Sequence, residues 1–152
     1  MIILTGGTGM IGSMIAWHLN TILNEDKFVI FDDLANQDQE KNIGKRKFID
    51  LIDKNNLPKF FRNNKEITAV IHMGAISATT ESNFNKLLIS NIRYSQMLWS
   101  WCSTNKVPFI YASSAATYGG GENGYDDDES SLSKLNPLNA YGYSKHFFDQ
   151  WV

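Results

Sequence analysis

The sequence contains one cysteine, Cys102, so no disulfide bond can form within the chain. A lone cysteine is typical of proteins from a reducing compartment. No apolar run is long enough to cross a bilayer, and the start Met1-Ile2-Ile3-Leu4 lacks the basic residues of a signal peptide. These absences predict a cytoplasmic protein without a membrane partner.

Neither sign of charge dominates the sequence. The chain has 14 lysines and arginines against 16 aspartates and glutamates. With its net charge of −2, it lacks the excess of basic residues that is typical of proteins that bind nucleic acid. Apolar residues make up 43% of the sequence, whereas a disordered chain would have fewer. At 152 residues the chain can bury a core, and we predict a globular protein without a nucleic-acid partner or a metal site.

Short apolar runs alternate with segments of helical periodicity. The runs predict strands at residues 2–4, 28–31, 48–51 (a short edge strand), 69–73 and 108–112. Helices are expected at 11–23, with Ile11, Ile15, Leu19 and Leu23 on one face, and at 57–63, 83–104 and 141–152. Polar loops are expected at 34–47 and 119–136. This alternation is typical of a doubly wound parallel α/β sheet with helices on both faces.

A glycine-rich segment, Thr5-Gly6-Gly7-Thr8-Gly9-Met10-Ile11-Gly12, follows the first strand and opens the first helix. Gly6, Gly9 and Gly12 let the backbone turn tightly, approach a pyrophosphate and pack helix on strand. The helix N-terminus offers free N–H groups to phosphate oxygens. A plain glycine-rich turn is the alternative, but the order of strand, turn and helix favours the dinucleotide site of a Rossmann fold.

Asp32 lies twenty residues after Gly12, at the end of the next predicted strand. Its carboxylate is suited to accept hydrogen bonds from an adenosine ribose, which favours NAD over NADP. Asp33 adds negative charge there, and a turn or capping aspartate is the open alternative for it. The carboxyl ends of parallel strands share one edge, so the loops at 5–12, 32–33, 73–80 and 112–118 are expected to converge.

Tyr141 and Lys145 are four residues apart on the last predicted helix, so both lie on one face. A lysine cation near a tyrosine lowers the pKa of the phenol, which suits it to exchange a proton with a sugar hydroxyl. Ser114 can hold the same oxygen by a hydrogen bond. This spacing is common by chance, but the preceding Ser113-Ser114 and the distance from the glycine loop favour a catalytic site.

Two polar residues within predicted elements have competing interpretations. Asn91, on the long helix, is a candidate to bind backbone or cofactor, and a plain surface asparagine is nearly as good an explanation. His72, on a strand, is more often a satisfied core histidine than a catalyst. We therefore include Asn91 among the candidate site residues and leave His72 out.

These motifs together resemble the extended short-chain dehydrogenases that act on nucleotide sugars. The segments at 72–81, 111–120 and 137–145 are similar to one subfamily, the ADP-L-glycero-D-manno-heptose 6-epimerases, and the resemblance covers essentially all 152 residues. It implies an isomerase that interconverts the D-glycero and L-glycero forms of ADP-manno-heptose at C-6, by transient oxidation with bound NADP, for lipopolysaccharide core precursors. It also implies a nucleotide-sugar substrate and a homo-oligomer for the full-length enzyme. The alternatives are another extended nucleotide-sugar epimerase or dehydratase, or a non-catalytic NAD(P)-binding fragment.

The resemblance also implies roles for individual residues. The positions that match cofactor contacts, beside the loop glycines Gly6, Gly9 and Gly12, are Met10, Ile11, Asp32, Asp33, Lys54, Met73, Gly74, Ala75, Ile76, Ser77, Asn91 and Lys145. Tyr141 matches the proton acceptor, Lys145 its partner, and Ser114 the hydroxyl on the substrate side.

The sequence departs from the family in two respects. Gln39 stands where a lysine near the adenosine 2′-phosphate is expected, with Lys41 close by, so NAD is the alternative to NADP. Family members are roughly twice as long, and the helical pattern at 141–152 has no stop signal. We therefore expect residues 1–152 to be one incomplete dinucleotide-binding domain, truncated before the substrate domain and inactive alone.

Overall fold

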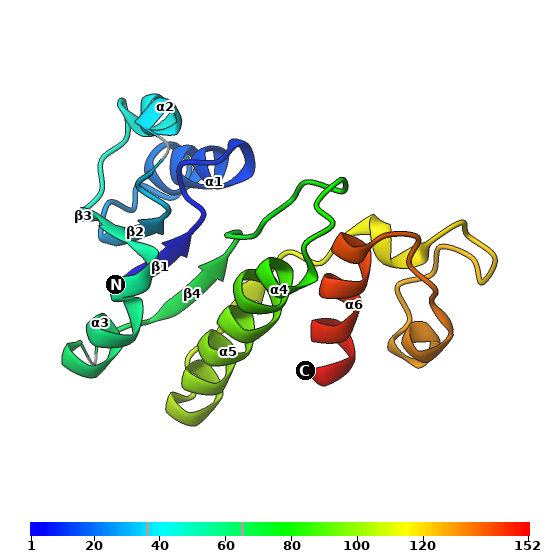
Figure 1. Cartoon of the computed structure of the whole chain (residues 1–152). Coiled ribbons are helices and arrows are strands. Elements are labelled where there is room, and N and C mark those ends of the chain that lie inside the picture. Colours follow the sequence, from blue (N-terminus) through cyan, green and yellow to red (C-terminus); the bar gives the residue numbers. More distant parts are fainter. Residues whose placement is uncertain (36, 65) are drawn as a thin grey trace. The chain divides into compact units, whose positions relative to one another are not determined.

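The computed structural model describes residues 1–35, 37–64 and 66–152 (Figure 1). The strands are β1 (Ile2–Thr5), β2 (Phe28–Asp32), β3 (Asp50–Asp53), β4 (Ala69–His72) and β5 (Phe109–Tyr111). The α-helices are α1 (Met10–Thr21), α2 (Gln37–Glu40), α3 (Leu57–Asn63), α4 (Phe84–Leu87), α5 (Tyr94–Asn105) and α6 (Ala140–Trp151). A π-helical segment (Leu88–Arg93) joins α4 to α5, and short 3-10 helices lie at Lys41–Ile43, Lys54–Asn56, Ala115–Tyr118 and Glu129–Lys134.

The strands form one parallel sheet in the order β3-β2-β1-β4-β5. The chain moves outward from β1 to β3 and then crosses back to β4 on the other side of β1. This order is typical of dinucleotide-binding sheets, in which ligands bind outside the carboxyl ends of the strands where the direction reverses. The reversal falls between β1 and β4, whose register pairs Thr5 with His72.

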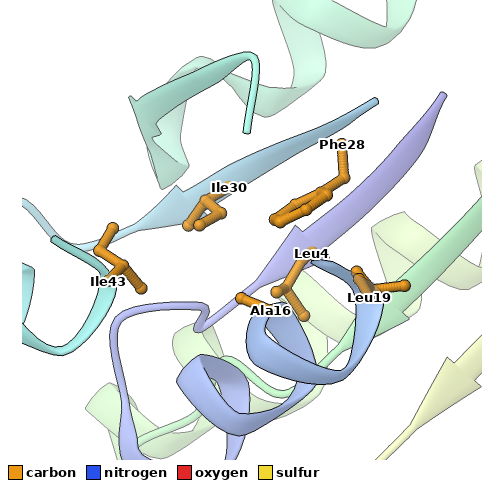
Figure 2. Close-up of a cluster of buried hydrophobic side chains, with 6 residues drawn as sticks. All are labelled: Leu4, Ala16, Leu19, Phe28, Ile30 and Ile43. Carbon is orange, nitrogen blue, oxygen red and sulfur yellow. The ribbon is translucent and has the colours of Figure 1, made fainter. Parts of the chain in front are cut away.

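The sheet is covered by helices on both faces. Figure 2 shows the cluster on one face, which gathers Leu4, Phe28 and Ile30 of the strands with Ala16 and Leu19 of α1 and with Ile43. Successive strand residues point to opposite faces, so Phe31 lies on the other face from Ile30. There its ring meets the ring of Phe60 of α3 edge-on, with the ring centroids 5.1 Å apart. The predicted doubly wound parallel α/β fold is confirmed.

The buried face of α1 differs from the prediction. Gly12, Ala16 and Leu19 are buried, whereas Ile11 is 56% exposed and Leu23, beyond the end of the helix, is 60% exposed. The reason lies at the helix start, where Gly12 packs against the backbone of the preceding loop. That contact turns position 12 inward, and position 11 consequently faces outward.

Residues 34–47 are more ordered than the predicted loop. The segment contains α2 and the 3-10 helix Lys41–Ile43, and Ile43 is buried in the cluster of Figure 2. Asn36 lies outside the described residues. One apolar residue in a polar stretch gives no periodicity, so its burial could not be predicted. The edge strand β3 begins at Asp50, two residues later than expected.

The predicted helix at 83–104 and the predicted loop at 119–136 also need correction. The helix is interrupted by the π-helical segment, and the loop contains the 3-10 helix Glu129–Lys134. Asp128 caps that short helix by accepting a hydrogen bond from the Ser130 N–H. The acidic run 126–129 is exposed.

The described chain forms two compact units. One consists of residues 1–74 and 102–111 and contains the whole sheet; the other consists of residues 75–101 and 112–152. In the second unit α6 lies beside α4, with an edge-on ring contact between Phe84 and Phe147 (Figure 1). One dinucleotide-binding domain over 1–152 stays a prediction. Across 1–35, 37–64 and 66–152, no helix is both long and apolar enough to cross a membrane.

Candidate functional site

The glycine loop of the first unit adopts a conformation that two of its glycines make possible. Gly6 has φ of +68°, a backbone angle that residues with a side chain rarely adopt, and its N–H donates to the Phe31 carbonyl at 2.8 Å. A Cβ on Gly12 would lie 2.0 Å from the Gly6 carbonyl oxygen. The loop therefore folds back onto the first turn of α1, and no side chain fits at position 12.

The loop after β4 packs directly against the glycine loop. The Met73 N–H donates to the Thr5 carbonyl at 3.0 Å, and the Gly74 N–H donates to Thr5 Oγ1 at 3.2 Å. A Cβ on Gly6 would lie only 2.5 Å from the Gly74 nitrogen. Met73 and Gly74, both predicted cofactor residues, thus adjoin Gly6 at the point where the strand order reverses.

His72 is a buried core histidine, as predicted. Its side chain is 2% exposed, and its Nδ1 lies 2.5 Å from Thr5 Oγ1. The ring stacks on Phe109 of β5 with centroids 5.9 Å apart. His72 thus connects three adjacent strands of the sheet.

Asp32 is bound to the glycine loop. Its Oδ2 accepts hydrogen bonds from the Thr8 N–H at 2.8 Å and from the Thr8 hydroxyl at 2.7 Å. The neighbouring Asp33 forms an ion pair with Lys54, with Nζ and Oδ2 2.8 Å apart. The hydrogen bond from Lys54 holds the pKa of Asp33 below its ordinary value. Gln39, from α2, reaches the same place, where its Oε1 lies 3.2 Å from the Thr8 hydroxyl.

Met10 and Ile11 occupy the first turn of α1, directly after the capping residue Gly9. Their side chains are 80% and 56% exposed, which is unusual for large apolar residues. A helix start carries N–H groups without intrahelical partners and the positive end of the dipole. An anion placed against this turn would therefore meet backbone donors next to an apolar surface.

In the second unit, Tyr141 and Lys145 lie one turn apart on α6. Tyr141 is 9% exposed and Lys145 is 7% exposed. The Lys145 Nζ donates to the Ala112 carbonyl at 2.8 Å. Burial lowers the pKa of Lys145, and the charge of Asp149 opposes part of that shift. The predicted pair is therefore buried, with the lysine fixed to the backbone beside Ser113 and Ser114.

Ser114 precedes the 3-10 helix at Ala115–Tyr118 and caps it. Its Oγ accepts a hydrogen bond from the Ala116 N–H at 3.2 Å, so the O–H remains the group that can donate to a substrate. The start of α6 packs on this 3-10 helix, since a Cβ on Gly142 would lie 2.7 Å from the Ala116 carbonyl oxygen. Ser114 and Tyr141 are thereby held on adjoining elements.

Asn91 is buried, at 1% exposed, so the surface interpretation is wrong. Its Oδ1 accepts from the Ile76 N–H at 2.8 Å, and its Nδ2 donates to the Ile76 carbonyl at 3.0 Å. The same Nδ2 donates to Ser144 Oγ at 2.9 Å. Asn91 thus binds the backbone of the segment Ala75–Ser77 from the π-helical segment.

The predicted site residues fall into two groups, each brought together within one unit. The first group comprises Gly6, Gly9, Met10, Ile11, Gly12, Asp32, Asp33, Lys54, Met73 and Gly74. The second comprises Ala75, Ile76, Ser77, Asn91, Ser114, Tyr141 and Lys145. Sequence reasoning missed Thr8, which binds Asp32, and Ser144, which binds Asn91. The one available signal for Ser144 was a small polar residue between Tyr141 and Lys145.

A parallel sheet in this order with a glycine loop closed on Gly12 is typical of dinucleotide-binding folds. A buried tyrosine and lysine one turn apart on a helix are typical of the short-chain reductase class. Over residues 2–152 the chain matches the NAD dependent epimerase/dehydratase family, and it belongs to that family.

Among curated relatives, the ADP-L-glycero-D-manno-heptose-6-epimerase of Fusobacterium nucleatum is 52% identical, over all of this chain and 47% of its own length. The enzyme of the same name from Nitratidesulfovibrio vulgaris is 43% identical, over all of this chain and 48% of its own length. The chain thus spans about half the length of the curated relatives it matches.

Solved structures show the same fold. The ADP-L-glycero-D-manno-heptose-6-epimerase of Helicobacter pylori superposes with a TM-score of 0.80 at 27% identity, covering 99% of this chain and 49% of that one. The UDP-glucuronic acid 4-epimerase of Bacillus cereus, solved with NAD, has a TM-score of 0.77 at 22% identity, with 99% and 49% covered.

Proposed function

We propose that this chain carries the dinucleotide site and the proton-transfer pair of an ADP-L-glycero-D-manno-heptose 6-epimerase. The observation that carries the proposal is Lys145, buried one turn from Tyr141 and bound to the carbonyl just before Ser113-Ser114. The substrate class is supported by the names of relatives that are similar along the whole of this chain. Homo-oligomerisation, which the resemblance implies, stays a prediction.

The first group of residues fits the adenosine and pyrophosphate of a dinucleotide. A Cβ at Gly6 or at Gly12 would clash with backbone atoms, so the loop can fold onto the first turn of α1 only because both are glycines. The N–H groups in the first turn of α1 are suited to the pyrophosphate, and Asp32 to the adenosine ribose. Bound there, a nicotinamide dinucleotide would accept a hydride from the sugar and return it.

The second group fits the proton side of the reaction. Tyr141, as the phenolate, takes the proton of the C-6 hydroxyl as that carbon becomes a ketone, and gives it back when the alcohol is re-formed. Lys145 lies one turn from Tyr141 on the same helix, with its Nζ fixed to the Ala112 carbonyl. Ser114 donates a hydrogen bond to the sugar oxygen that loses and regains the proton. No net oxidation of the sugar results, because the hydride returns to C-6 on the opposite face.

The charges around Asp32 favour NAD over NADP. Asp32 and Asp33 bring two carboxylates to the end of β2, and the Lys54 ammonium is paired with Asp33. A 2′-phosphate would meet carboxylates and a cation that is already paired. NADP, which the family resemblance implies, is the alternative. We expect Asp33→Asn to raise NADP affinity relative to NAD by about fivefold, in line with one exposed charge pair. Nicotinamide fluorescence titrations measure both affinities.

The experiment for the epimerase itself uses the whole gene product, and residues 1–152 taken alone are tested separately. Purified protein is incubated with ADP-D-glycero-D-manno-heptose and with UDP-sugars, and the products are resolved by chromatography and NMR. Conversion of the ADP-heptose alone supports the proposal, whereas conversion of a UDP-sugar instead would assign another nucleotide-sugar enzyme. Dinucleotide binding without any conversion would indicate a dinucleotide-binding protein without catalysis, and would overturn the proposed epimerase function.

Tyr141→Phe tests the proton acceptor. Removing the hydroxyl deletes the group that exchanges the proton, so turnover should fall by about 10²- to 10⁴-fold. The dinucleotide affinity should stay within about twofold, because the ring is retained. Activity close to that of the unaltered protein would disprove the role of Tyr141.

A further inference from the structure

A chain of buried polar groups connects three segments of the second unit. Asn91 makes three side-chain hydrogen bonds, two to the backbone of Ile76 and one to Ser144. An amide has two donor hydrogens and one acceptor oxygen, so these bonds use both hydrogens and the oxygen. Asn91 and Ser144 are 1% and 0% exposed. A buried network of this kind is rigid when every member is satisfied and costly when one member is removed.

Ser144 makes the connection to α6. Its Oγ accepts from Asn91 Nδ2 at 2.9 Å and donates to the Tyr141 carbonyl at 2.7 Å. The second bond lies within the first turn of the helix, at the residue proposed to exchange the proton. Ser144 therefore links the backbone at Tyr141 to Asn91, and through Asn91 to the segment at Ala75–Ser77.

The π-helical segment supplies the geometry that this link requires. A π turn has one residue more than an α turn and shifts the side chains that follow it. Asn91 lies within Leu88–Arg93, and the Ser95 hydroxyl donates to its carbonyl at 2.6 Å. Such insertions are often found at functional sites. Here the inserted turn contains Asn91, whose side chain bonds both to the segment Ala75–Ser77 and to α6.

We propose that Ser144 is a positioning residue for the reaction: it fixes the rotation and height of α6 against Asn91, and so sets where Tyr141 stands relative to the segment Ala75–Ser77. This inference rests on the proposed function, which places the proton exchange at Tyr141, and on the family resemblance, which implies cofactor contacts at Ala75–Ser77. Lys145 is anchored separately, through the Ala112 carbonyl. Loss of the Ser144 link would thus move the tyrosine while the lysine keeps its anchor.

The expected consequence is a loss of rate rather than of binding. Displacing a reacting group by about 1 Å can lower a rate by about 10²-fold. For Ser144→Ala we expect kcat to fall between about 10- and 100-fold, with KM and dinucleotide affinity within about threefold.

The matched control is Ser95→Ala. Ser95, in α5, is also a buried serine, 3% exposed, and its hydroxyl bonds to the backbone carbonyl of Asn91, not to the Asn91 side chain. Its removal should cost comparable stability and leave kcat unchanged. Ser144→Cys provides a second variant that nearly preserves volume and weakens both hydrogen bonds. Its rate should be intermediate between those of Ser144→Ala and the unaltered protein.

The outcomes separate this inference from the proposed function. If the unaltered protein shows no epimerisation, the proposed function fails, and the inference fails with it. If the unaltered protein turns over and Ser144→Ala matches it in kcat, only the positioning role is wrong. Equal losses in Ser144→Ala and Ser95→Ala would also overturn it, because they would show a general effect of removing buried hydroxyls. If Ser144→Ala does not fold, the kcat of Ser144→Cys decides, and an unchanged value refutes the role.

Discussion

At the scale of single residues, one hydrogen atom in place of a methyl group lets the glycine loop close. Any side chain at position 12 would begin 2.0 Å from the Gly6 carbonyl oxygen and 2.7 Å from the Gly7 Cα. Both neighbours are backbone atoms, so they cannot rotate away as a side chain could. The loop would have to move as a whole, and with it the surface proposed to meet a pyrophosphate.

Gly12→Ala is therefore expected to destabilise the protein by about 1–3 kcal/mol, the usual cost of forcing extra volume into a packed site, and to abolish dinucleotide binding. Chemical denaturation and fluorescence titration measure the two effects. Gly44→Ala is the control, because its Cβ would have no neighbour closer than 3.6 Å and its φ of −59° suits alanine. Normal dinucleotide affinity in Gly12→Ala would contradict the proposed role of the loop.

His146 provides a prediction about pH. It is 4% exposed, and its Nδ1 has no hydrogen-bond partner among the described residues. Burial lowers the pKa of His146, with a smaller opposing effect from Asp149. The unfolded chain therefore takes up a proton near the ordinary pKa of 6.5 while the folded chain does not. Since the unfolded state then binds more protons, stability falls as the pH drops below about 6.5.

His146→Phe removes this titration. Relative to the unaltered protein, the variant should gain stability as the pH is lowered from 7.5 toward 5.5, by less than about 1.4 kcal/mol per pH unit, the most that one proton contributes. Urea unfolding at a series of pH values measures the difference. Two stability curves that run parallel across this range would show that the buried imidazole does not titrate as argued.

At the scale of elements, the stability of α6 depends on Asn139, the residue just before the helix. Asn139 has an extended backbone, and its side-chain oxygen accepts from the Gly142 N–H at 2.8 Å, which caps the helix. Tyr141 is the second residue of α6, so fraying of the first turn would displace it. The cap therefore stabilises the element and fixes the proposed proton acceptor together.

Asn139→Ala should cost about 1 kcal/mol of stability and lower turnover, whereas Asn139→Asp should retain both because aspartate also caps helices well. Thermal unfolding and steady-state rates measure the pair. As a control, Asn85→Ala changes an exposed asparagine on α4 and should alter neither. If Asn139→Ala lost stability but kept its full rate, the cap would be structural only.

The elements also show where periodicity fails as evidence. The spacing of apolar residues predicted the strands and the helix at 83–104, because burial of one face repeats every two or 3.6 residues. It could not reveal the π turn at Leu88–Arg93, since one inserted residue leaves the pattern on either side intact. It also misplaced the buried face of α1, where a glycine, invisible to a hydrophobicity pattern, makes the closest contact.

At the scale of the whole molecule, the candidate residues with distinctive chemistry were predictable, and their supporting partners were not. The glycine loop, Asp32 and the pair Tyr141 and Lys145 have fixed local spacings. Ser144 and Asn91 are 53 residues apart, and Thr8 and Asp32 are 24 apart. Such contacts depend on how elements pack, which local spacing does not encode. The sequence therefore identifies the candidate reacting groups, while the structure identifies the residues that hold them.

The last prediction concerns the 152-residue chain itself. All the predicted cofactor contacts lie within it, so we expect it to bind a nicotinamide dinucleotide, with quenching of nicotinamide fluorescence as the measurement. The chain spans about half the length of its curated relatives, and its candidate residues assign only Ser114 and Tyr141 to the sugar, so we expect no conversion of ADP-heptose by this chain. The chain carrying Gly12→Ala is the control and should bind no dinucleotide. Conversion above the level of a Tyr141→Phe chain would show that residues 1–152 suffice to hold the sugar nucleotide and to react with it.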